Sequence, residues 1–315
     1  MTVPHSAEHP SERPAGPNTG PNADHSADDT GAIPTVNDTA RAPSEEPAEM
    51  PRRALILGES AMALDLEQAY KRMGFDTRIG AASIAEVFYP GIIVTSGDAE
   101  DTIETVEEVS QRVGAVVAPS VEACRHTADR MAVRKQANEE LGLPTLDYEF
   151  AATPQEMHDA VERIGYPCVV KAPTSKDGEG FSFVHSDADL ADAWRAADRG
   201  LGQGAVVERY IDFDFEATIL AARSIDPSTG ELATWFCEPI GTRHRDGKLV
   251  ESWQPAPLPE AAMDNARSIA ARIVGAMASC GIFSVEMFVS GDDVYFSQVT
   301  PRPSRDGLVT FVTQR

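Results

Sequence analysis

The stretch from Tyr166 to Val184 constrains the fold most, because it joins a short apolar run to a glycine-containing loop. The run Cys168-Val-Val-Lys171 predicts a buried strand that ends in a lysine, and the residues after Gly180 predict a second strand. Lysine is a compact cation suited to phosphate oxygens, and Gly178 and Gly180 let backbone N–H groups approach an anion closely. The pattern indicates a polyphosphate held between a lysine and a loop. A solvated lysine beside an ordinary turn would give the same pattern.

Length and charge narrow the classes of protein. A chain of 315 residues is long enough for two domains, each with its own core. The formal net charge of -23 argues against nucleic acid, whose phosphates would repel it, but allows a local cationic site for a nucleotide. The four cysteines are widely spaced, which is typical of thiols in a reducing compartment. With neither a membrane-spanning apolar run nor a signal-peptide pattern, we expect a soluble cytoplasmic protein without membrane or nucleic-acid partners.

Residues 1–50 have the composition of a disordered tail rich in Pro, Ser and Asp. They hold eight of the 22 prolines, no Phe, Trp or Tyr, and nine acidic against two basic residues. Such a segment buries too little apolar surface to offset its ordering entropy. A regulatory arm and a misassigned start codon would look alike here.

Residues 51–120 are expected to form a short Rossmann-like domain with a parallel sheet, because strands alternate with helices. The expected strands are 53–58, 91–94 and 114–118. The first expected helix has Met62, Leu66, Tyr70 and Met73 on one face and stops at Gly74, and an acidic helix covers about 100–113. The loop after the first strand has a single glycine, Gly58, so a dinucleotide pyrophosphate would be poorly received.

Residues 121–315 mix helices with strands that follow each other directly. We expect a helix over 121–141 that contains Arg130, a capping box at Thr153-Pro-Gln-Glu156, and another helix from Ser186. Expected strands follow at 205–211 and 212–220, then a helix from Pro259 to Cys280 capped by Gly281. A hairpin of 283–289 and 294–303 ends the pattern.

Several polar residues in these strands have two readings. The segment from Glu208 to Ile211 could present its backbone to an adenine edge and Glu216 could accept bonds from ribose, or both acids could be solvent-facing strand residues. Glu286 and Gln298 interrupt apolar strands, which is costly if they are buried without partners. An outward-facing side of a half-exposed hairpin would explain them equally well.

Taken together, these residues resemble the ATP-grasp enzymes, and within them the formate-dependent phosphoribosylglycinamide formyltransferases of purine biosynthesis. The resemblance is strong from about Arg130 onward, weaker over 53–119 and absent from the tail. It rests on four strings: Gly165-Tyr-Pro-Cys-Val-Val-Lys171, Phe213-Asp-Phe-Glu216, Glu251-Ser-Trp-Gln-Pro255 and Pro301-Arg-Pro303. It implies an α/β and α+β chain, with an ATP-grasp fold at 121–315 after the Rossmann-like domain. A small lid subdomain is expected at about 145–205, and the remaining, C-terminal subdomain is expected to be incomplete.

The resemblance also implies roles for individual residues. ATP phosphates would be held by Arg130 and Lys171 and covered by the loop Lys176, Asp177, Gly178, Glu179, Gly180 and Phe181. Adenine would meet Glu208, Arg209, Tyr210 and Ile211, ribose would meet Glu216, Mg²⁺ would bind Glu286 and Gln298, and Arg302 would face the transferring phosphoryl group. In such enzymes ATP phosphorylates formate, and the amine of glycinamide ribonucleotide then attacks the acyl phosphate. Proteins of this kind are commonly homodimers.

The chain also departs from the family pattern. Gln298 is neutral where the family has its second metal-binding acid, and Glu179 stands where the loop has a lysine. Arg305 occupies the place of an acid, and Ala61 that of the acid in a substrate-binding loop. A β-α unit between Ile79 and Ile92 and the family's C-terminal portion after Arg315 are expected to be missing. These departures keep open an alternative: an ATP-grasp homologue that binds nucleotide with impaired or altered catalysis.

Overall fold

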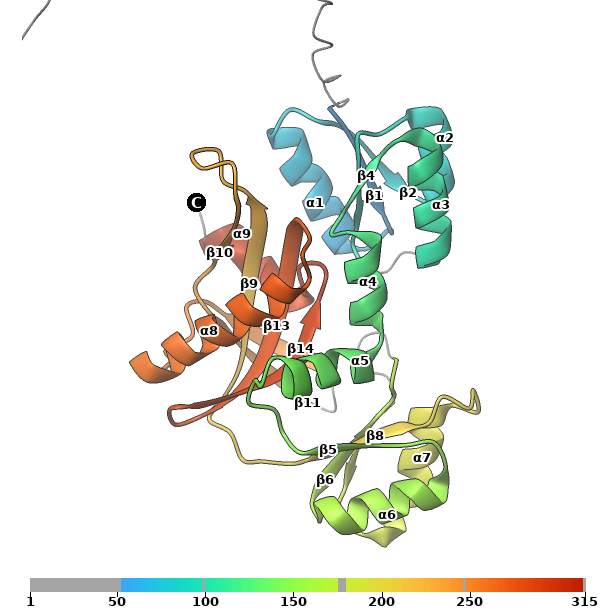
Figure 1. The fold of residues 1–315 in the computed structure, drawn as a ribbon, viewed down its shortest axis with the longest axis vertical. Helices are drawn as coiled ribbons and strands as arrows, with labels where there is room; N and C mark the ends of the chain where they lie inside the picture. Colours follow the sequence, from blue (N-terminus) through green and yellow to red (C-terminus); the bar gives the residue numbers. More distant parts are fainter. Residues whose placement is uncertain (1–51, 98–99, 175–179, 246–247, 314–315) are drawn as a thin grey trace, which may run out of the picture. The chain divides into compact units, whose positions relative to one another are not determined.

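A computed structural model describes residues 52–97, 100–174, 180–245 and 248–313 (Figure 1). The expected tail and the loop residues Lys176, Asp177, Gly178 and Glu179 lie outside the described residues. The chain divides into two units, 1–48 and 49–315, and every described residue belongs to the second. In this described part of the chain, each helix is too short or too polar to cross a membrane.

The first sheet is parallel, with helices on both faces. Its strands are β1 (Arg53–Leu57), β2 (Asp76–Gly80), β3 (Ile92–Thr95) and β4 (Val116–Ala118), in the order β2-β1-β3-β4. The helical segments are α1 (Ala61–Arg72), η1 (Ala82–Ile84), α2 (Ala85–Phe88) and α3 (Ile103–Val113). Alternate residues of β1 face opposite sides: Leu55 packs with α2 and α3, whereas Ile56 packs with α1. The expected parallel sheet is therefore confirmed.

Two details of this first region differ from or extend the sequence-based expectations. Met62, Leu66 and Tyr70 pack inward as expected, but Met73 is exposed because α1 ends at Arg72, one residue earlier. Strand β2 was not expected. Residues 81–91, which connect it to β3, hold only η1 and α2 and no further strand.

The expected single helix over 121–141 is wrong, because the helical backbone is interrupted at Asp129. The structure has α4 (Val121–Ala128), α5 (Arg130–Lys135) and a π-helical turn (Gln136–Glu140). Asp129 adopts an extended backbone, and its carboxylate accepts hydrogen bonds from Met131 N (2.9 Å) and Ala132 N (3.1 Å). An aspartate that caps a helix in this way begins a new helix rather than continuing an old one. Arg130 is therefore the first residue of α5.

The second sheet is antiparallel and has helices on one face. Its strands are β5 (Tyr148–Ala151), β6 (Cys168–Lys171), β7 (Phe181–Val184) and β8 (Ala205–Arg209), in the order β5-β8-β6-β7. Helix α6 (Pro154–Ile164), the turn η3 (Asp187–Asp189) and α7 (Leu190–Asp198) lie against it. Thr153 caps α6 as expected, and Glu156 accepts from Ala152 N. Strand β5 was not anticipated.

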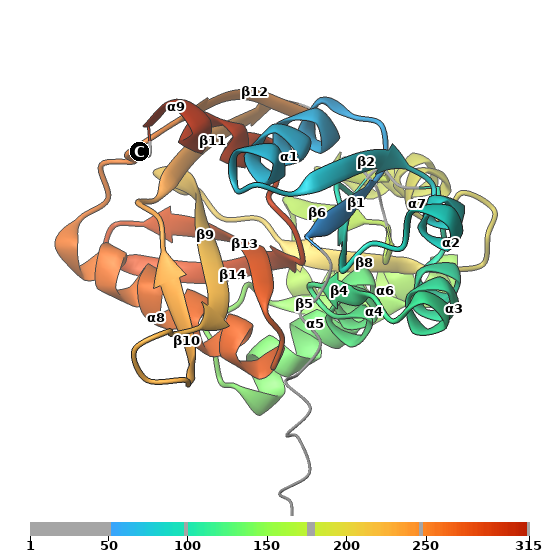
Figure 2. The same ribbon diagram turned by 90° about the horizontal axis from the view of Figure 1, so that it is seen from above.

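The third sheet is larger and antiparallel. Its strands are β9 (Phe215–Ile225), β10 (Leu232–Phe236), β11 (Ile240–Arg245), β12 (Lys248–Trp253), β13 (Gly281–Ser290) and β14 (Asp293–Thr300). The order is β12-β11-β9-β13-β14, with β10 paired to β9. Helix α8 (Glu260–Ala276) packs along one face (Figure 2). The short helices η4 (Arg305–Val309) and α9 (Thr310–Thr313) follow β14.

Gly281 does not cap α8 as expected. The helix ends at Ala276, and Gly281 begins β13 with a φ of +140°. A Cβ at Gly281 would lie 2.6 Å from Pro119 Cγ, so glycine is required by this close approach to the segment after β4. The parallel sheet followed by antiparallel sheets confirms the expected α/β and α+β fold class.

Candidate functional site

Lys171 lies in a buried ionic network centred on Glu208. The Lys171 ammonium and the Arg134 guanidinium, on β6 and α5, donate to different oxygens of the Glu208 carboxylate on β8. The side chains of Glu208 and Arg134 are each 2% exposed, and that of Lys171 is 13% exposed. Arg134 also donates to the carbonyl oxygen of Phe296 on β14 (2.9 Å). The network therefore ties α5 to both antiparallel sheets and fixes the lysine.

The electrostatics of the network follow from burial and from opposite charge. Burial acts to raise the pKa of Glu208, but Arg134 and Lys171 outweigh it and lower that pKa to about 2. Burial lowers the pKa of Lys171, and Glu208 opposes the shift. Burial likewise lowers the pKa of Arg130, and the negative charge of Glu208 opposes this shift. Glu208 is therefore ionised at neutral pH, and its negative charge compensates the positive charges of Arg134 and Lys171 in the interior of the protein.

Arg134 was not singled out from the sequence. It follows Arg130 by four residues, so the two arginines lie one helical turn apart on the same side of α5. Arg130 N donates to the carbonyl oxygen of Pro173, just beyond β6, at 3.4 Å. The i, i+4 spacing of two arginines at the start of a helix was the signal available in the sequence.

Glu286 and Gln298 lie side by side on the hairpin of β13 and β14. The register pairs Glu286 with Gln298 on one side and with Thr218 of β9 on the other. Their neighbours Val285 and Met287 point into the core beneath α8, so Glu286 lies on the opposite face. Both polar side chains are half-buried. Both lie on the face of the hairpin that points away from the core beneath α8, and neither is fully exposed.

Four charged residues act on the pKa of the Glu286 carboxyl. Burial raises the pKa of Glu286 to about 7, and the charge of Asp306 adds to the increase. Arg130, His244 and Arg302 act in the opposite direction. The structure thus brings Glu286 together with the two expected cations Arg130 and Arg302, and with two residues that the sequence reading gave no role in this group, Asp306 and His244.

Glu216 is paired with His244. The His244 Nδ1 atom lies 2.6 Å from Glu216 Oε2, across the neighbouring strands β9 and β11. This hydrogen bond raises the pKa of His244. The pairing depends on the register of β9 and β11, and the two residues are 28 positions apart in sequence, so no local pattern indicated it.

Arg302 lies over the loop that follows β3. A Cβ at Gly97 would fall 1.7 Å from Arg302 Nε, so the arginine passes through the space that a side chain at position 97 would fill. The carbonyl oxygen of Arg302 accepts a hydrogen bond from Ser284 Oγ of β13 (2.8 Å). Arg302 thus connects the parallel-sheet region with the face of the sheet that carries Glu286.

The remaining expected residues lie near the same strands. Phe181 faces Lys171 in the register of β6 and β7. Gly180 accepts from Ala172 N at 2.9 Å and has a φ of +73°; a Cβ there would lie 2.7 Å from that of Ala172. The glycine is therefore needed where β7 begins. Of the expected loop over the phosphates, only Gly180 and Phe181 are described.

Residues at the end of β8 point in different directions. Arg209 pairs with the exposed Asp147 at 2.8 Å, and strand alternation directs it away from the face that carries Glu208. Tyr210 leaves the sheet, and its ring contacts Phe183 of β7 at 5.3 Å between centroids. Ile211 continues the connection to β9. Since the Glu208 carboxylate is occupied by two cations, an adenine contact in this segment would use backbone groups.

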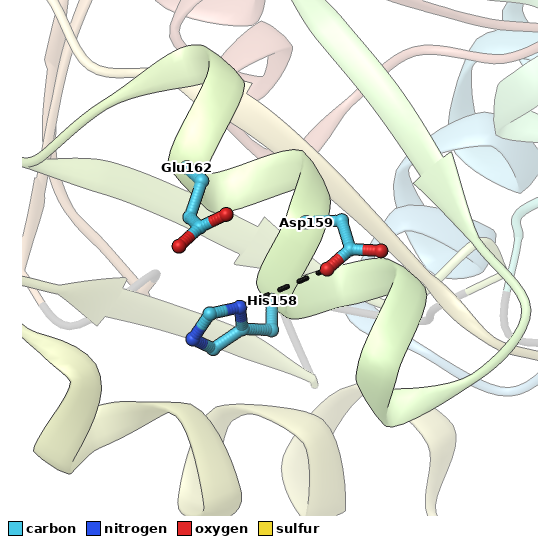
Figure 3. Close-up of side chains that lie close together, drawn as sticks. All are labelled: His158, Asp159 and Glu162. Atoms are coloured by element: carbon cyan, nitrogen blue, oxygen red, sulfur yellow. Dashed lines mark ion pairs between the residues drawn. The ribbon is translucent and has the colours of Figure 1, made fainter.

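A separate polar group lies on α6. The side chains of His158, Asp159 and Glu162 point toward one another (Figure 3), and one ligand atom of each lies within 4.8 Å of the others. Helix α6 packs on the face of the second sheet that carries Cys168 and alternates with the face of Lys171. This partly buried group is therefore separate from the residues around Lys171.

Comparison with known proteins agrees with this arrangement. The family model for the ATP-grasp domain matches residues 136–315, more than half of the chain, so the protein is a member of the ATP-grasp class. The chain is 43% identical to the formate-dependent phosphoribosylglycinamide formyltransferase of Corynebacterium efficiens, over 84% of this chain and 72% of that protein. It is 48% identical to the Rhodococcus jostii protein of the same name, over 69% of this chain and 54% of that protein. The chain belongs to the formate-dependent phosphoribosylglycinamide formyltransferase family.

Solved structures support the same assignment. Glycinamide-RNase-transformylase T from Mycobacterium tuberculosis superposes with a TM-score of 0.66 at 28% identity, covering 82% of this chain and 76% of that chain. N5-carboxyaminoimidazole synthetase from Staphylococcus aureus, solved with ADP, has a TM-score of 0.71 at 16% identity, covering 82% and 73%. At that identity the second likeness shows the fold alone.

Proposed function

We propose that this chain uses ATP to activate formate and transfers the formyl group to the amine of glycinamide ribonucleotide. A formate oxygen would attack the γ-phosphorus of ATP, releasing ADP and leaving formyl phosphate. The amine nitrogen would then attack the formyl carbon, releasing phosphate and a proton. Family membership supports the proposal. The observation that carries it is that Arg130, which lies next to the strand of Lys171, acts electrostatically on both Lys171 and Glu286, while Arg302 acts on Glu286 as well.

The site residues fit the demands of phosphoryl transfer. This chemistry requires cations that neutralise phosphate oxygens and a fixed geometry rather than a covalent nucleophile. In our proposal Lys171 and Arg130 hold the phosphates, and Arg302 faces the phosphoryl group that is transferred. Glu216 receives the ribose hydroxyls, and the segment from Glu208 to Ile211 meets adenine through its backbone.

The same proposal includes a magnesium site. Mg²⁺ prefers hard oxygen ligands, and the Glu286 carboxylate and the Gln298 amide oxygen, paired across the hairpin, are of this kind. Bound Mg²⁺ would neutralise charge on the phosphate oxygens. A neutral amide contributes less to this site than a carboxylate would.

Release of ADP tests the activity. The full chain is incubated with Mg-ATP, formate and glycinamide ribonucleotide, and then with each omitted in turn. The proposal expects turnover that needs both formate and the amine. Lys171→Met should remove turnover, whereas Lys71→Met, at an exposed lysine of α1, is the matched control and should not. ADP release that is independent of either substrate would contradict the proposal.

A second candidate is an ATP-grasp protein that binds nucleotide but catalyses poorly. Two observations favour it: Gln298 is neutral opposite Glu286, and Ala61, at the start of α1, offers no acid to a substrate. In the same assay, this candidate predicts calorimetric heat on adding Mg-ATP without ADP release. The absence of heat at millimolar nucleotide would exclude both candidates.

We also propose the division, location and assembly of the chain. The division is a Rossmann-like domain at 51–120 and an ATP-grasp domain at 121–315 with a lid at about 145–205, which is supported by the three separate sheets. The cytoplasm is the compartment expected of an enzyme that uses ATP and formate. A homodimer, as expected from the resemblance, would be tested by light scattering of the full chain.

A further inference from the structure

The turn after β14, which comprises Ser304 and the start of η4, contains two buried oxygens that lack a hydrogen-bond partner among the described residues. They are Ser304 Oγ and Asp306 Oδ2. Asp306 is only 6% exposed, and Ser304 only 8%. A buried carboxylate oxygen without a donor loses its hydration without replacement, which is strongly unfavourable. Such an oxygen requires a partner that the described residues do not supply, and a bound ion is one partner that would satisfy it.

Hydrogen bonds and packing place Asp306 over the sheet face that carries Glu286. Ser304 N donates to Ser284 Oγ of β13 at 2.8 Å. The backbone of Gly307 approaches Leu220 so closely that a Cβ would lie 3.2 Å from its Cδ1. Ser284 and Leu220 are direct partners in the register of β13 and β9.

Glu286 is two residues along β13 from that contact. Two residues of a strand span about 7 Å and return to the same face of the sheet. Asp306 and Glu286 therefore lie above the same face of the sheet, about one strand repeat apart. Two carboxylates above one face of a sheet can supply oxygens to the same divalent cation.

Strand β14 supplies no second negative charge directly opposite Glu286. Gln298, opposite Glu286 on β14, has a neutral amide. Sites for divalent cations at phosphates normally include one or two carboxylates. Among the described residues, the buried Oδ2 atom of Asp306 has no hydrogen-bond partner, so this carboxylate has an oxygen available for a cation.

We propose that Asp306 provides the second anionic ligand, beside Glu286, for the divalent cation that accompanies the nucleotide, in the role left open by the neutral Gln298. The inference rests on the proposed function, because the cation is the one bound with ATP. Asp306, in η4, would thus supply the second negative charge that the hairpin lacks opposite Glu286.

Binding of Mn²⁺ tests the assignment without relying on activity. The full chain is saturated with a non-hydrolysable ATP analogue, and free Mn²⁺ is followed by electron paramagnetic resonance. Asp306→Asn should weaken Mn²⁺ binding about tenfold or more. Adding Gln298→Glu in the same chain restores the number of carboxylates and should recover most of the affinity. Asp293→Asn, at the exposed first residue of β14, is the matched control and should leave binding unchanged.

Thermal unfolding gives a second readout that a purely structural role would not produce. Without a divalent cation, Asp306→Asn removes repulsion and should keep or raise the melting temperature. With Mg²⁺ and nucleotide, the parent should be stabilised more than the variant. A variant that unfolds in both conditions would contradict the inference, because it would show that Asp306 serves the fold.

The outcomes separate the inference from the proposed function. If the parent binds nucleotide and Asp306→Asn binds Mn²⁺ as tightly as the parent does, the assignment of Asp306 is overturned and the proposed function stands. If the parent binds no nucleotide at any Mn²⁺ concentration, both are overturned.

Discussion

Lys171 and Glu208 form an ion pair in which the carboxylate is fully buried while the lysine keeps a small exposed area. The two residues lie on the adjacent strands β6 and β8. An ammonium has three N–H donors, and Glu208 accepts from one of them. The pair therefore holds the lysine in place at the sheet face without using all of its hydrogen-bonding capacity.

Glu208→Gln should destabilise the protein strongly. The substitution leaves the Arg134 and Lys171 cations buried without their anion, and breaking a buried pair in this way typically costs about 3–5 kcal/mol. Urea unfolding at neutral pH measures the change. Glu149→Gln, which removes the exposed-surface partner of Arg163, is the control and should cost less than about 1 kcal/mol. Similar losses for both variants would contradict the special role of Glu208.

Stability should fall in acid because of the same carboxylate. The pKa of Glu208 is lowered to about 2 in the folded chain from an ordinary value of 4.5, since Arg134 and Lys171 outweigh the effect of burial. A lowered folded pKa gives stability that is fully present above pH 4.5 and is lost as pH falls toward 2. The stability difference between parent and Glu208→Gln should shrink by about 3 kcal/mol across that window. A difference that stays constant from pH 5 to pH 2 would show that Glu208 is not the titrating group.

The sequence correctly indicated those features of the fold and the candidate site that depend on a short stretch of residues. Lys171 and Glu286 were identified because a charged residue at the end or in the middle of an apolar strand is conspicuous, and the cap at Thr153 because it needs only four residues. The break at Asp129 was missed because the apolar spacing continues across it. Only the competition between capping and helix continuation decides such a case.

Contacts set by strand register were outside the reach of the sequence. His244 meets Glu216 because β9 and β11 pair with one particular register, and Arg134 of α5 meets Glu208 of β8 across 74 residues of sequence. A shift of one residue would turn each strand residue to the opposite face. For the same reason the position of Asp306 above Glu286 could not be read from the chain.

Lys171→Met should weaken nucleotide binding at least tenfold while leaving the fold intact. The methionine keeps a similar length but removes the cation, and Arg134 still compensates Glu208. Calorimetric titration with Mg-ATP at neutral pH measures the affinity, and unfolding in urea measures the stability. We expect the stability loss to be smaller than that of Glu208→Gln. Unchanged affinity in a folded variant would place the phosphates elsewhere.

Gly97→Ala should reduce turnover by displacing Arg302. Position 97 has a φ of +91°, so alanine is strained there by about 1–2 kcal/mol, and its Cβ would overlap Arg302 Nε. Because an arginine side chain is flexible, we expect it to move away while the fold survives. Since Arg302 is proposed to face the transferring phosphoryl group, the rate of ADP release should fall tenfold or more.

Gly114→Ala is the matched control for Gly97→Ala. Gly114 also has a positive φ, of +70°, but a Cβ there meets no atom within 4 Å. The two variants therefore share backbone strain, and only one displaces an arginine. Their losses of stability in urea should be similar, whereas the fall in ADP release should appear in Gly97→Ala alone. Equal turnover in the two variants would mean that the position of Arg302 over the loop after β3 does not matter for phosphoryl transfer.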